Sequence, residues 1–288
     1  MKTRIIDGIA IGRAVRSEWR PKAEALSLQG HQPGLAAISV GDNPAARIYL
    51  RNKVRACAET GLHSEVHHFP GDCTETEILQ RIGKLNSDPR IHGILVQLPL
   101  PPHISSSNVV DAISADKDVD GFHFYNLGSL VAGHSTFPPC TPYGVMRMLE
   151  YENIPVRGQH AVVVGASNTV GKPMAMMLLQ KGATVTICNS KTPDIAFHTR
   201  HADILVVAVG HPQLIKRGMV KSGATVIDVG INRLADGRLA GDVDFEDVMG
   251  KAGALTPVPG GVGPMTVTML LINTIEAAQL AAKGMIKS

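Results

Sequence analysis

Tyr49 and Lys53 stand four residues apart in the segment SVGDNPAARIYLRNKVRACAETG, which has the pattern of a strand end, a turn and a helix. Side chains four apart project from the same edge of a helix, so a phenol and an ammonium group can serve one ligand. We expect the apolar stripe of this helix to consist of Leu50, Val54, Cys57 and Ala58, with the Tyr/Lys pair on its flank. Such a pair is also common on ordinary protein surfaces, so it does not establish a site alone.

A second polar group follows an apolar run in the segment HGILVQLPLPP, where Gln97 comes before Pro99 and Pro101, which end strand pairing. Open parallel sheets bind ligands outside the carboxyl ends of their strands. The helix described above also follows a strand end, so its lysine and Gln97 are expected to converge. The segment DKDVDG adds three acids, most of which should cap turns or face solvent while one can face the site: Asp116, Asp118 and Asp120.

The segment VVVGASNTVGKP is typical of a phosphate-binding turn. Gly165, Ser167 and Gly171 lie between a buried strand and a helix, where backbone N–H groups and the helix dipole favour a phosphate. The spacing departs from GxGxxG, because Ser167 replaces the middle glycine and the last glycine comes one residue later. A plain tight turn is the alternative, and the strand–helix–strand context favours a dinucleotide over it.

The end of the next strand distinguishes the two nicotinamide dinucleotides. An NAD site usually places an acid here for the ribose hydroxyl. This chain has Asn189, Ser190, Lys191 and Thr192 instead. A hydroxyl and a cation favour the 2′-phosphate of NADP, and an ordinary solvated loop lysine is the alternative.

Short apolar runs alternate with helical patterns along the chain, which predicts parallel sheets built from βαβ units. The predicted strands are 35–40, 65–69, 93–98, 161–165, 184–188, 204–209, 225–229 and 254–255. Pro138 and Pro139 mark a boundary, after which Thr141 is the expected N-cap of a helix running to Glu150. A strongly apolar helix of about 20 residues begins near Pro264, and its burial against either domain is possible on this pattern.

Composition excludes several classes of protein. A length of 288 residues fits two domains at roughly 150 residues each, and 44% hydrophobic with 18% charged residues fits a globular chain. The net charge of +3, without a long basic run, does not favour nucleic acid or an anionic membrane as partner. The first residues lack the apolar core of a signal peptide, and we expect no membrane span. Four scattered cysteines indicate reduced thiols in a cytosolic protein, and the twelve histidines show no metal-ligand spacing.

Taken together, these segments resemble the bifunctional methylenetetrahydrofolate dehydrogenase/methenyltetrahydrofolate cyclohydrolase family of one-carbon metabolism. The resemblance spans nearly the whole chain, in order, and its last segment is long and specific. It rests on VGDNPA…YLRNKVRAC, GILVQLPLP, KDVDGFH, PCTPYGV, VVVGASNTVGKPMAMMLL, VIDVGIN and TPVPGGVGPMTVTML.

The resemblance implies two α/β domains with a cleft between them: a folate-binding catalytic domain of residues 1–140 plus 265–288, and a Rossmann-like NADP-binding domain of residues 141–264. The implied catalytic residues are Lys53, Tyr49, Gln97 and Asp120, of which Asp120 holds the pterin. The implied substrate contacts are Tyr49, Gln97, Leu98, Asp120, Pro259, Gly260 and Gly261. The implied cofactor contacts are Gly165, Ala166, Ser167, Gly171, Ser190, Lys191, Gly230 and Ile231.

The activities implied are the NADP-dependent oxidation of 5,10-methylenetetrahydrofolate and hydrolysis of the methenyl product to 10-formyltetrahydrofolate, a folate interconversion that feeds purine biosynthesis. The family also implies a cytoplasmic homodimer without a metal. Three other interpretations are a dehydrogenase with weak or absent cyclohydrolase activity, a non-catalytic folate- or NADP-binding protein, and an unrelated Rossmann oxidoreductase. The last leaves Tyr49, Lys53 and Gln97 unexplained.

The chain departs from the family pattern at a few positions. A serine often follows NPA in the family, and Ala46 stands there in this chain. Ala166 occupies a position that is arginine in some members, and Asn189 and Lys191 replace a histidine and an arginine. A lysine keeps the positive charge but lacks the bidentate fork of a guanidinium.

Overall fold

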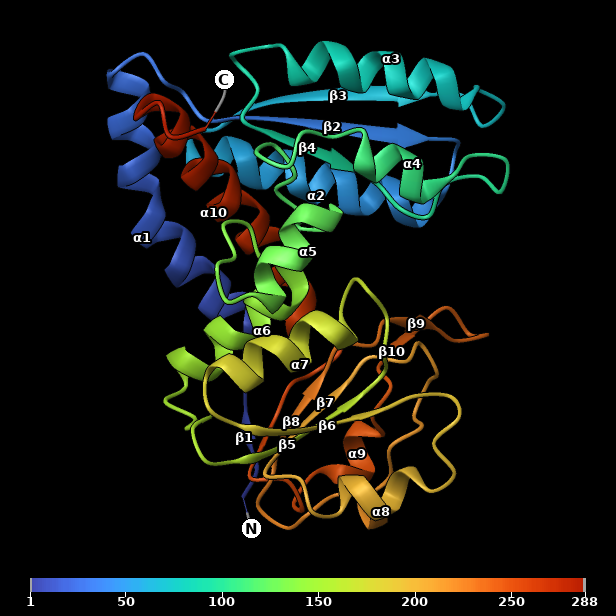
Figure 1. Cartoon of the computed structure of the whole chain (residues 1–288). Helices are drawn as coiled ribbons and strands as arrows, with labels where there is room; N and C mark the ends of the chain where they lie inside the picture. Colours follow the sequence, from blue (N-terminus) through green and yellow to red (C-terminus); the bar gives the residue numbers. More distant parts are fainter. Residues whose placement is uncertain (1, 287–288) are drawn as a thin grey trace. The chain divides into compact units, whose positions relative to one another are not determined.

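The computed structural model describes residues 2–286, apart from the side chains of Pro44 and Ala45. The chain forms two compact units (Figure 1). The small-sheet unit comprises Ala14–Cys140 and Val267–Ser288, and the large-sheet unit comprises Met1–Arg13 and Thr141–Thr266. Two long helices, α1 (Gly8–Leu28) and α10 (Val262–Ala282), contribute residues to both.

The small-sheet unit has a parallel sheet in the order β3-β2-β4. Its strands are β2 (Gly34–Val40), β3 (His63–Phe69) and β4 (Gly93–Val96). The helices α2 (Pro44–Thr60) and α3 (Glu75–Asn86) lie on opposite faces of this sheet (Figure 1), and α4 (Ser106–Asp111) and α5 (Phe124–Val131) follow β4. Because strand order reverses at β2, a ligand-binding position is expected at the carboxyl ends of β2 and β4.

The core between this sheet and α3 explains why these segments fold as they do. Ile78, Ile82 and Leu85 recur at helical spacing on α3 and are buried against Ile38 and Ile94 of the sheet. The helix begins at a capping box, in which Thr74 and Glu77 satisfy each other's backbone N–H groups. β2 and β4 are therefore held rigidly at the edge where their carboxyl ends meet.

The large-sheet unit contains a six-stranded parallel sheet in the order β1-β11-β8-β7-β5-β6. Its strands are β1 (Arg4–Ile5), β5 (His160–Val164), β6 (Thr184–Cys188), β7 (Ile204–Val207), β8 (Thr225–Asp228) and β11 (Ala254–Leu255). Helices α6 (Cys140–Tyr151) and α7 (Gly171–Gln180) lie on one side, and α8 (Ile195–Thr199) and α9 (Phe245–Val248) on the other (Figure 1). A short antiparallel pair, β9 (Asn232–Arg233) with β10 (Leu239–Ala240), and the 3-10 helix η1 (Arg217–Met219) complete it.

The predicted fold class, two α/β domains with parallel sheets, is confirmed. The strands expected at 184–188 and 254–255 have those bounds, and the other predicted strands end within two residues of the observed ones. The two-residue strands β1, β9 and β10 were not predicted, because none of them is a buried apolar run like the equally short β11.

The units differ from the expected domains at two places: Met265 and Thr266 belong to the large-sheet unit, and so does the beginning of the chain. Residues 1–13 were expected in the first domain, but they belong to the large-sheet unit. The Arg4 N–H donates to the Gly253 carbonyl over 2.9 Å and the Ile6 N–H donates to Leu255 over 2.9 Å, which makes β1 the edge strand beside β11. Strand pairing between the two ends of the chain, which leaves no local pattern, decides this placement.

α10 is the one helix among residues 2–286 whose length and hydropathy would suffice to cross a membrane. Most of it is buried within the protein, including Met269, Leu271 and Ile275, each less than 1% exposed. Burial of the whole circumference accounts for the apolar composition without a membrane.

The close packing of β4 makes a stability prediction. A Cβ at Gly93 would lie 2.7 Å from a methyl of Val119 and 3.0 Å from the Thr274 hydroxyl. We therefore expect Gly93→Ala to lower the free energy of unfolding in urea by about 1–3 kcal/mol through overpacking. The matched control is Gly83→Ala in α3, where nothing lies within 4 Å of the added Cβ. That variant should be more stable by roughly 0.5–1 kcal/mol, and equal effects at the two sites would contradict the packing argument.

Candidate active site

Lys53 lies on the buried face of α2. Its residue is only 9% exposed, and it shares this face with Leu50, Cys57 and Thr60, which are also buried. The spacing of three, four and three residues places the four on one stripe. The predicted stripe is therefore wrong in two respects: Ala58 is exposed, and Lys53 belongs to the stripe instead of its flank.

The Lys53 ammonium group has a defined partner at the end of β4. Lys53 Nζ donates to Gln97 Oε1 over 3.2 Å, and Gln97 Nε2 donates to the Leu98 carbonyl over 3.0 Å. The Gln97 backbone N–H donates to the Ile38 carbonyl over 2.9 Å, which fixes it beside β2. Because the amide Nε2 is bound to a carbonyl, the amide presents its oxygen to the lysine.

Asp120 lies close enough to Lys53 for the two charges to interact. It follows a segment that runs alongside β4, where the Ile94 N–H donates to the Lys117 carbonyl over 2.8 Å and Ile94 pairs with Asp118. Burial raises the pKa of Asp120 to about 6, and the charge of Lys53 opposes this rise. The structure thus brings together Lys53, Gln97 and Asp120, as the sequence predicted.

Tyr49 precedes Lys53 by one helical turn and is partly buried. Burial raises the pKa of its phenol, so the group is neutral at physiological pH. Its location on the same helix agrees with the predicted pairing.

Asp118, one of the acids expected to cap a turn, and two groups that the sequence analysis gave no role, Cys140 and Asn273, hold the Asp120 segment. Asp118 accepts hydrogen bonds from the backbone N–H groups of Gly121 and His123, over 3.2 and 2.8 Å, and thus caps the turn. The Val119 carbonyl accepts from Cys140 Sγ over 3.2 Å and from Asn273 Nδ2 over 2.8 Å. Burial, with the nearby charge of Asp120, raises the pKa of Cys140 well above its usual range, so this thiol is neutral.

The predicted cofactor turn follows β5. The strand order reverses at β5, because the next strand, β6, pairs with one side of it and the one after that, β7, pairs with the other side. Gly165 has φ +122°, and a Cβ there would collide with the Ala208 carbonyl. A Cβ on Gly171 would collide with the Gly165 carbonyl. Ser167 Oγ accepts from the N–H groups of Val170 and Gly171, over 3.1 and 3.4 Å, and so shapes the turn that opens α7. Both glycines are needed for the chain to turn this tightly at the start of a helix.

The loops after β6 and β8 end at the same edge of the large sheet. The Gly165 N–H donates to the Cys188 carbonyl over 2.9 Å, which brings the glycine turn beside the end of β6. Ser190 and Lys191 are exposed in the next loop, and Gly230 and Ile231 follow β8, with Ile231 44% exposed. Ala166 is partly buried beside the turn. The predicted cofactor residues therefore share one edge of one sheet.

The segment containing Pro259, Gly260 and Gly261 connects β11 to α10 in the large-sheet unit. Gly260 has φ +104°, and a Cβ on Gly261 would lie 2.5 Å from the Pro257 carbonyl. The segment packs against Gly8, at the start of α1. These three predicted substrate residues thus belong to the large-sheet unit, whereas Tyr49, Lys53, Gln97, Leu98 and Asp120 belong to the small-sheet unit.

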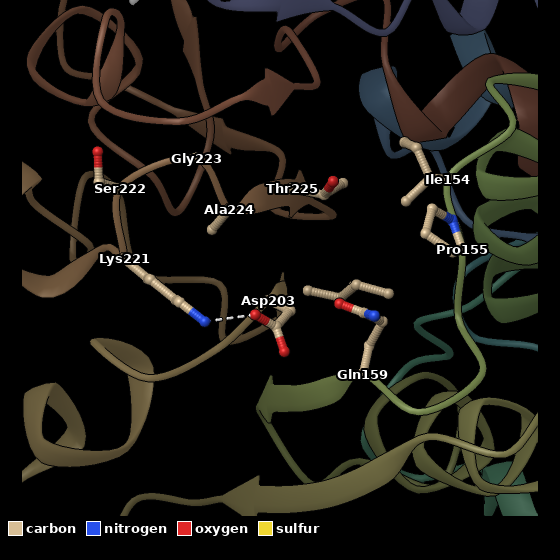
Figure 2. A pocket seen from close by; sticks show the side chains of 10 residues that line it. Ile154, Pro155, Gln159, Asp203, Lys221, Ser222, Gly223, Ala224 and Thr225 are labelled. Atoms are coloured by element: carbon tan, nitrogen blue, oxygen red, sulfur yellow. Dashed lines mark hydrogen bonds and ion pairs between the residues drawn. The ribbon is translucent and has the colours of Figure 1, made fainter.

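A cavity of about 220 Å³ lies elsewhere in the large-sheet unit, at the amino ends of β7 and β8 (Figure 2). Lys221 Nζ donates to Asp203 Oδ1 over 2.5 Å at this cavity, which Ile154, Pro155 and Gln159 also line. Ligands of open α/β sheets bind at the carboxyl ends of strands, and this cavity is at the opposite edge. It is therefore not the candidate active site.

Comparison with known proteins agrees with this arrangement. Residues 6–120 match the family model described as the catalytic domain of tetrahydrofolate dehydrogenase/cyclohydrolase, and residues 139–282 match that of its NAD(P)-binding domain.

The chain belongs to the tetrahydrofolate dehydrogenase/cyclohydrolase family.

Relatives of this family match over nearly full length. The bifunctional protein FolD of Nitrosospira multiformis is 63% identical over 281 residues, which cover 98% of each chain. The crystal structure of the bifunctional enzyme FolD from Campylobacter jejuni has a TM-score of 0.94 at 48% identity, covering 96% of this chain and 99% of that one. FolD of Trypanosoma brucei, solved with NADP and an inhibitor, has a TM-score of 0.95 at 36% identity, covering 98% and 99%.

Membership of this family confirms the predicted resemblance and the prediction of an enzyme with dehydrogenase and cyclohydrolase activities. The match to an NAD(P)-binding domain agrees with the predicted cofactor turn in the large-sheet unit. The tetrahydrofolate dehydrogenase/cyclohydrolase fold thus accounts for both strand-end sites described above.

The proximity of Lys53 to Asp120 makes a testable prediction about charge. We expect the Asp120 carboxyl to titrate near pH 6 in a ¹³C NMR titration, because burial disfavours its charged form. In Lys53→Met the opposing charge is absent, so the Asp120 pKa should rise further. Arg51→Met removes an exposed charge from the same helix and should leave the titration unchanged. An Asp120 carboxyl that titrates near pH 4 would contradict the buried environment.

Proposed function

We propose that Lys53, Gln97, Tyr49 and Asp120 carry out the folate chemistry of this enzyme. The substrate is 5,10-methylenetetrahydrofolate, which is oxidised with NADP to the 5,10-methenyl compound and then hydrolysed to 10-formyltetrahydrofolate. The observation that carries the assignment is the buried Lys53 ammonium group, held 3.2 Å from Gln97 Oε1 beside Asp120.

Asp120 would fix the substrate for oxidation. Its carboxylate can accept hydrogen bonds from the amino and ring N–H donors of a pterin, which determines the face that the ring presents. Tyr49 lies one helical turn from Lys53 and offers a flat, partly buried ring on which the substrate can rest. NADP, when bound, supplies the acceptor for the hydride that leaves the one-carbon bridge.

Hydrolysis of the methenyl cation requires proton transfers that Lys53 can perform. Water forms a bond to the methenyl carbon and its oxygen becomes the formyl oxygen, the bond from this carbon to one ring nitrogen breaks, that nitrogen gains one of the two water protons, and the other proton is released. Lys53 is the basic group of the site, and it can move protons between the water and the ring nitrogen. Gln97 orients Nζ through a neutral amide, and so adds no charge of its own beside the cationic substrate.

NADP is the cofactor, and its diphosphate would lie at the Gly165 turn and the first residues of α7, where backbone N–H groups favour an anion. Ser167 and Gly171 shape this turn. Ser190 and Lys191 offer a hydroxyl and a cation to the ribose 2′-phosphate. The NADP complex of the trypanosomal relative supports this choice of dinucleotide.

The units divide the work accordingly. The small-sheet unit binds folate and the large-sheet unit binds NADP, which the family matches at residues 6–120 and 139–282 support. Pro259, Gly260 and Gly261 belong to the large-sheet unit, and their contact with folate stays a prediction. We also propose a cytoplasmic homodimer whose ligands are small molecules. Neither nucleic acid nor membrane is proposed as a partner, because the net charge is only +3.

The role of Lys53 is tested by Lys53→Ala. We expect cyclohydrolase activity to fall by about 10²–10⁴, the usual contribution of a positioned acid–base group, while NADP binding by calorimetry is unchanged. Formation of reduced cofactor and of 10-formyl product should be followed separately, with Arg51→Ala as the exposed control on the same helix. A Lys53→Ala enzyme that hydrolyses the methenyl compound at the wild-type rate would overturn the assignment.

Asp120 gives a pH prediction. The carboxylate is the hydrogen-bond acceptor, and with a raised pKa of about 6 it becomes protonated as the pH falls through that value. We therefore expect the KM for folate to rise below about pH 6 in the wild type, while the KM for NADP stays constant. Asp120→Asn should remove this pH dependence, and Asp120→Ala should lose both activities. A pH-independent KM for folate in the wild type would contradict this role.

A further inference from the structure

Two buried carboxylates lie at the edge of the large sheet that carries the predicted cofactor residues. Asp228 ends β8 and is 3% exposed, and Asp242 follows β10 and is 0% exposed. Neither is used in the chemistry described above. We propose that Asp242 and Asp228 are positioning residues that hold the loops after β7 and β8 in the shape that receives the nicotinamide half of NADP.

Asp242 joins the loop after β7 to the loop after β8. Its Oδ2 accepts hydrogen bonds from the N–H groups of Val209 and Gly210, over 2.6 and 2.9 Å. Its Oδ1 accepts from Asn232 Nδ2 over 2.8 Å. Both oxygens of one buried carboxylate thus join the loop after β7 to the first residue of β9, which follows the loop after β8.

Asp228 fixes Asp242 in turn. Its Oδ1 accepts from the N–H groups of Gly230 and Asp242, over 3.0 and 2.9 Å, and its Oδ2 accepts from the Val243 N–H over 2.9 Å. Burial raises the pKa of Asp228 to about 7, while these N–H donors oppose the rise by favouring the carboxylate. The pair therefore forms a continuous network that begins at β8 and ends in the loop after β7.

Glycines allow the backbone to approach this network. A Cβ on Gly230 would collide with the Asp242 carboxyl group, and a Cβ on Gly241 would collide with that of Asp228. On its other side, the β7 loop touches the cofactor turn, because the Ala208 carbonyl occupies the space a Cβ on Gly165 would need. A displacement of Val209 and Gly210 would therefore also move the Ala208 carbonyl that packs against Gly165 in the cofactor turn.

These contacts determine what the two residues do. The segment from Ala208 to Gly210 follows β7, and the exposed Ile231 comes shortly after β8, next to Gly230. Both lie near the carboxyl end of β5, where the strand order reverses and a dinucleotide is expected to bind. Asp242 sets the separation of these two loops through its hydrogen bonds. The inference rests on the proposed placement of NADP at this edge.

A reversed hydrogen bond tests the proposal. In Asp242→Asn, the new amide can still offer its oxygen to Val209 and Gly210, and the Asn232 amide can turn over so that its oxygen accepts from the new NH₂ group. In Asn232→Asp, two carboxylates meet. In the double variant Asp242→Asn/Asn232→Asp, the amide donates to a carboxylate and the bond is restored with its direction reversed.

We expect Asn232→Asp to raise the KM for NADP by roughly tenfold or more, with the KM for folate within about twofold of wild type. Amide hydrogen exchange at Val209 and Gly210 should be faster in Asn232→Asp. The double variant should recover the wild-type exchange and most of the affinity for NADP.

An Asn232→Asp variant that turns over with an unchanged KM for NADP would overturn the proposal. So would a double variant that folds but binds NADP as weakly as Asn232→Asp, because the residues would then act on stability or directly on the cofactor. If Asn232→Asp does not fold, a double variant with the wild-type KM for NADP supports the proposal, and one with a KM raised roughly tenfold or more overturns it. Failure of the proposed function is separate, since wild-type protein would then reduce no NADP while the exchange measurements still report on the loops.

Discussion

The burial of one cation constrains the whole candidate folate site. Lys53 occupies a position on α2 that the helical pattern would assign to an apolar residue, and a buried ammonium group is costly unless it is hydrogen-bonded or paired. Gln97 Oε1 accepts from it at 3.2 Å, and Asp120 supplies an opposing charge nearby. Since Gln97 is tied to β2 and the Asp120 segment runs along β4, the sheet register places both partners where the lysine requires them.

In the large-sheet unit, the buried charged groups are carboxylates, and they are hydrogen-bonded mainly by backbone N–H groups. Asp228 and Asp242 are buried without a cation among their hydrogen-bond partners, and N–H groups of the loops satisfy them instead. Loops that end parallel strands have N–H groups that no neighbouring strand accepts, so a buried carboxylate can bind several of them at once. In both units, polar groups inside the fold thus give the strand ends a fixed shape for ligands.

The parts of this arrangement that could be predicted depend on local pattern. Apolar runs located the long strands, and glycines at positions 165 and 171 marked the tight turn that the structure shows between β5 and α7. The stripe on α2 was predicted wrongly, because Ala58 was placed on it and Lys53 on its flank, whereas Lys53 is buried and Ala58 is exposed. Asn273, Asp242 and Cys140 gave no signal, since each acts through contacts with residues distant along the chain.

By itself, the sequence determined the α/β class, the family and the glycine turn, because these follow from short-range periodicity and contiguous motifs. Only the tertiary structure decided that β1 completes the large sheet, that Lys53 points inward to Gln97, and that two carboxylates tie the loops after β7 and β8 together. The reason is physical. Strand pairing and the satisfaction of buried polar groups are settled by which segments meet in space, and a linear pattern does not carry that information.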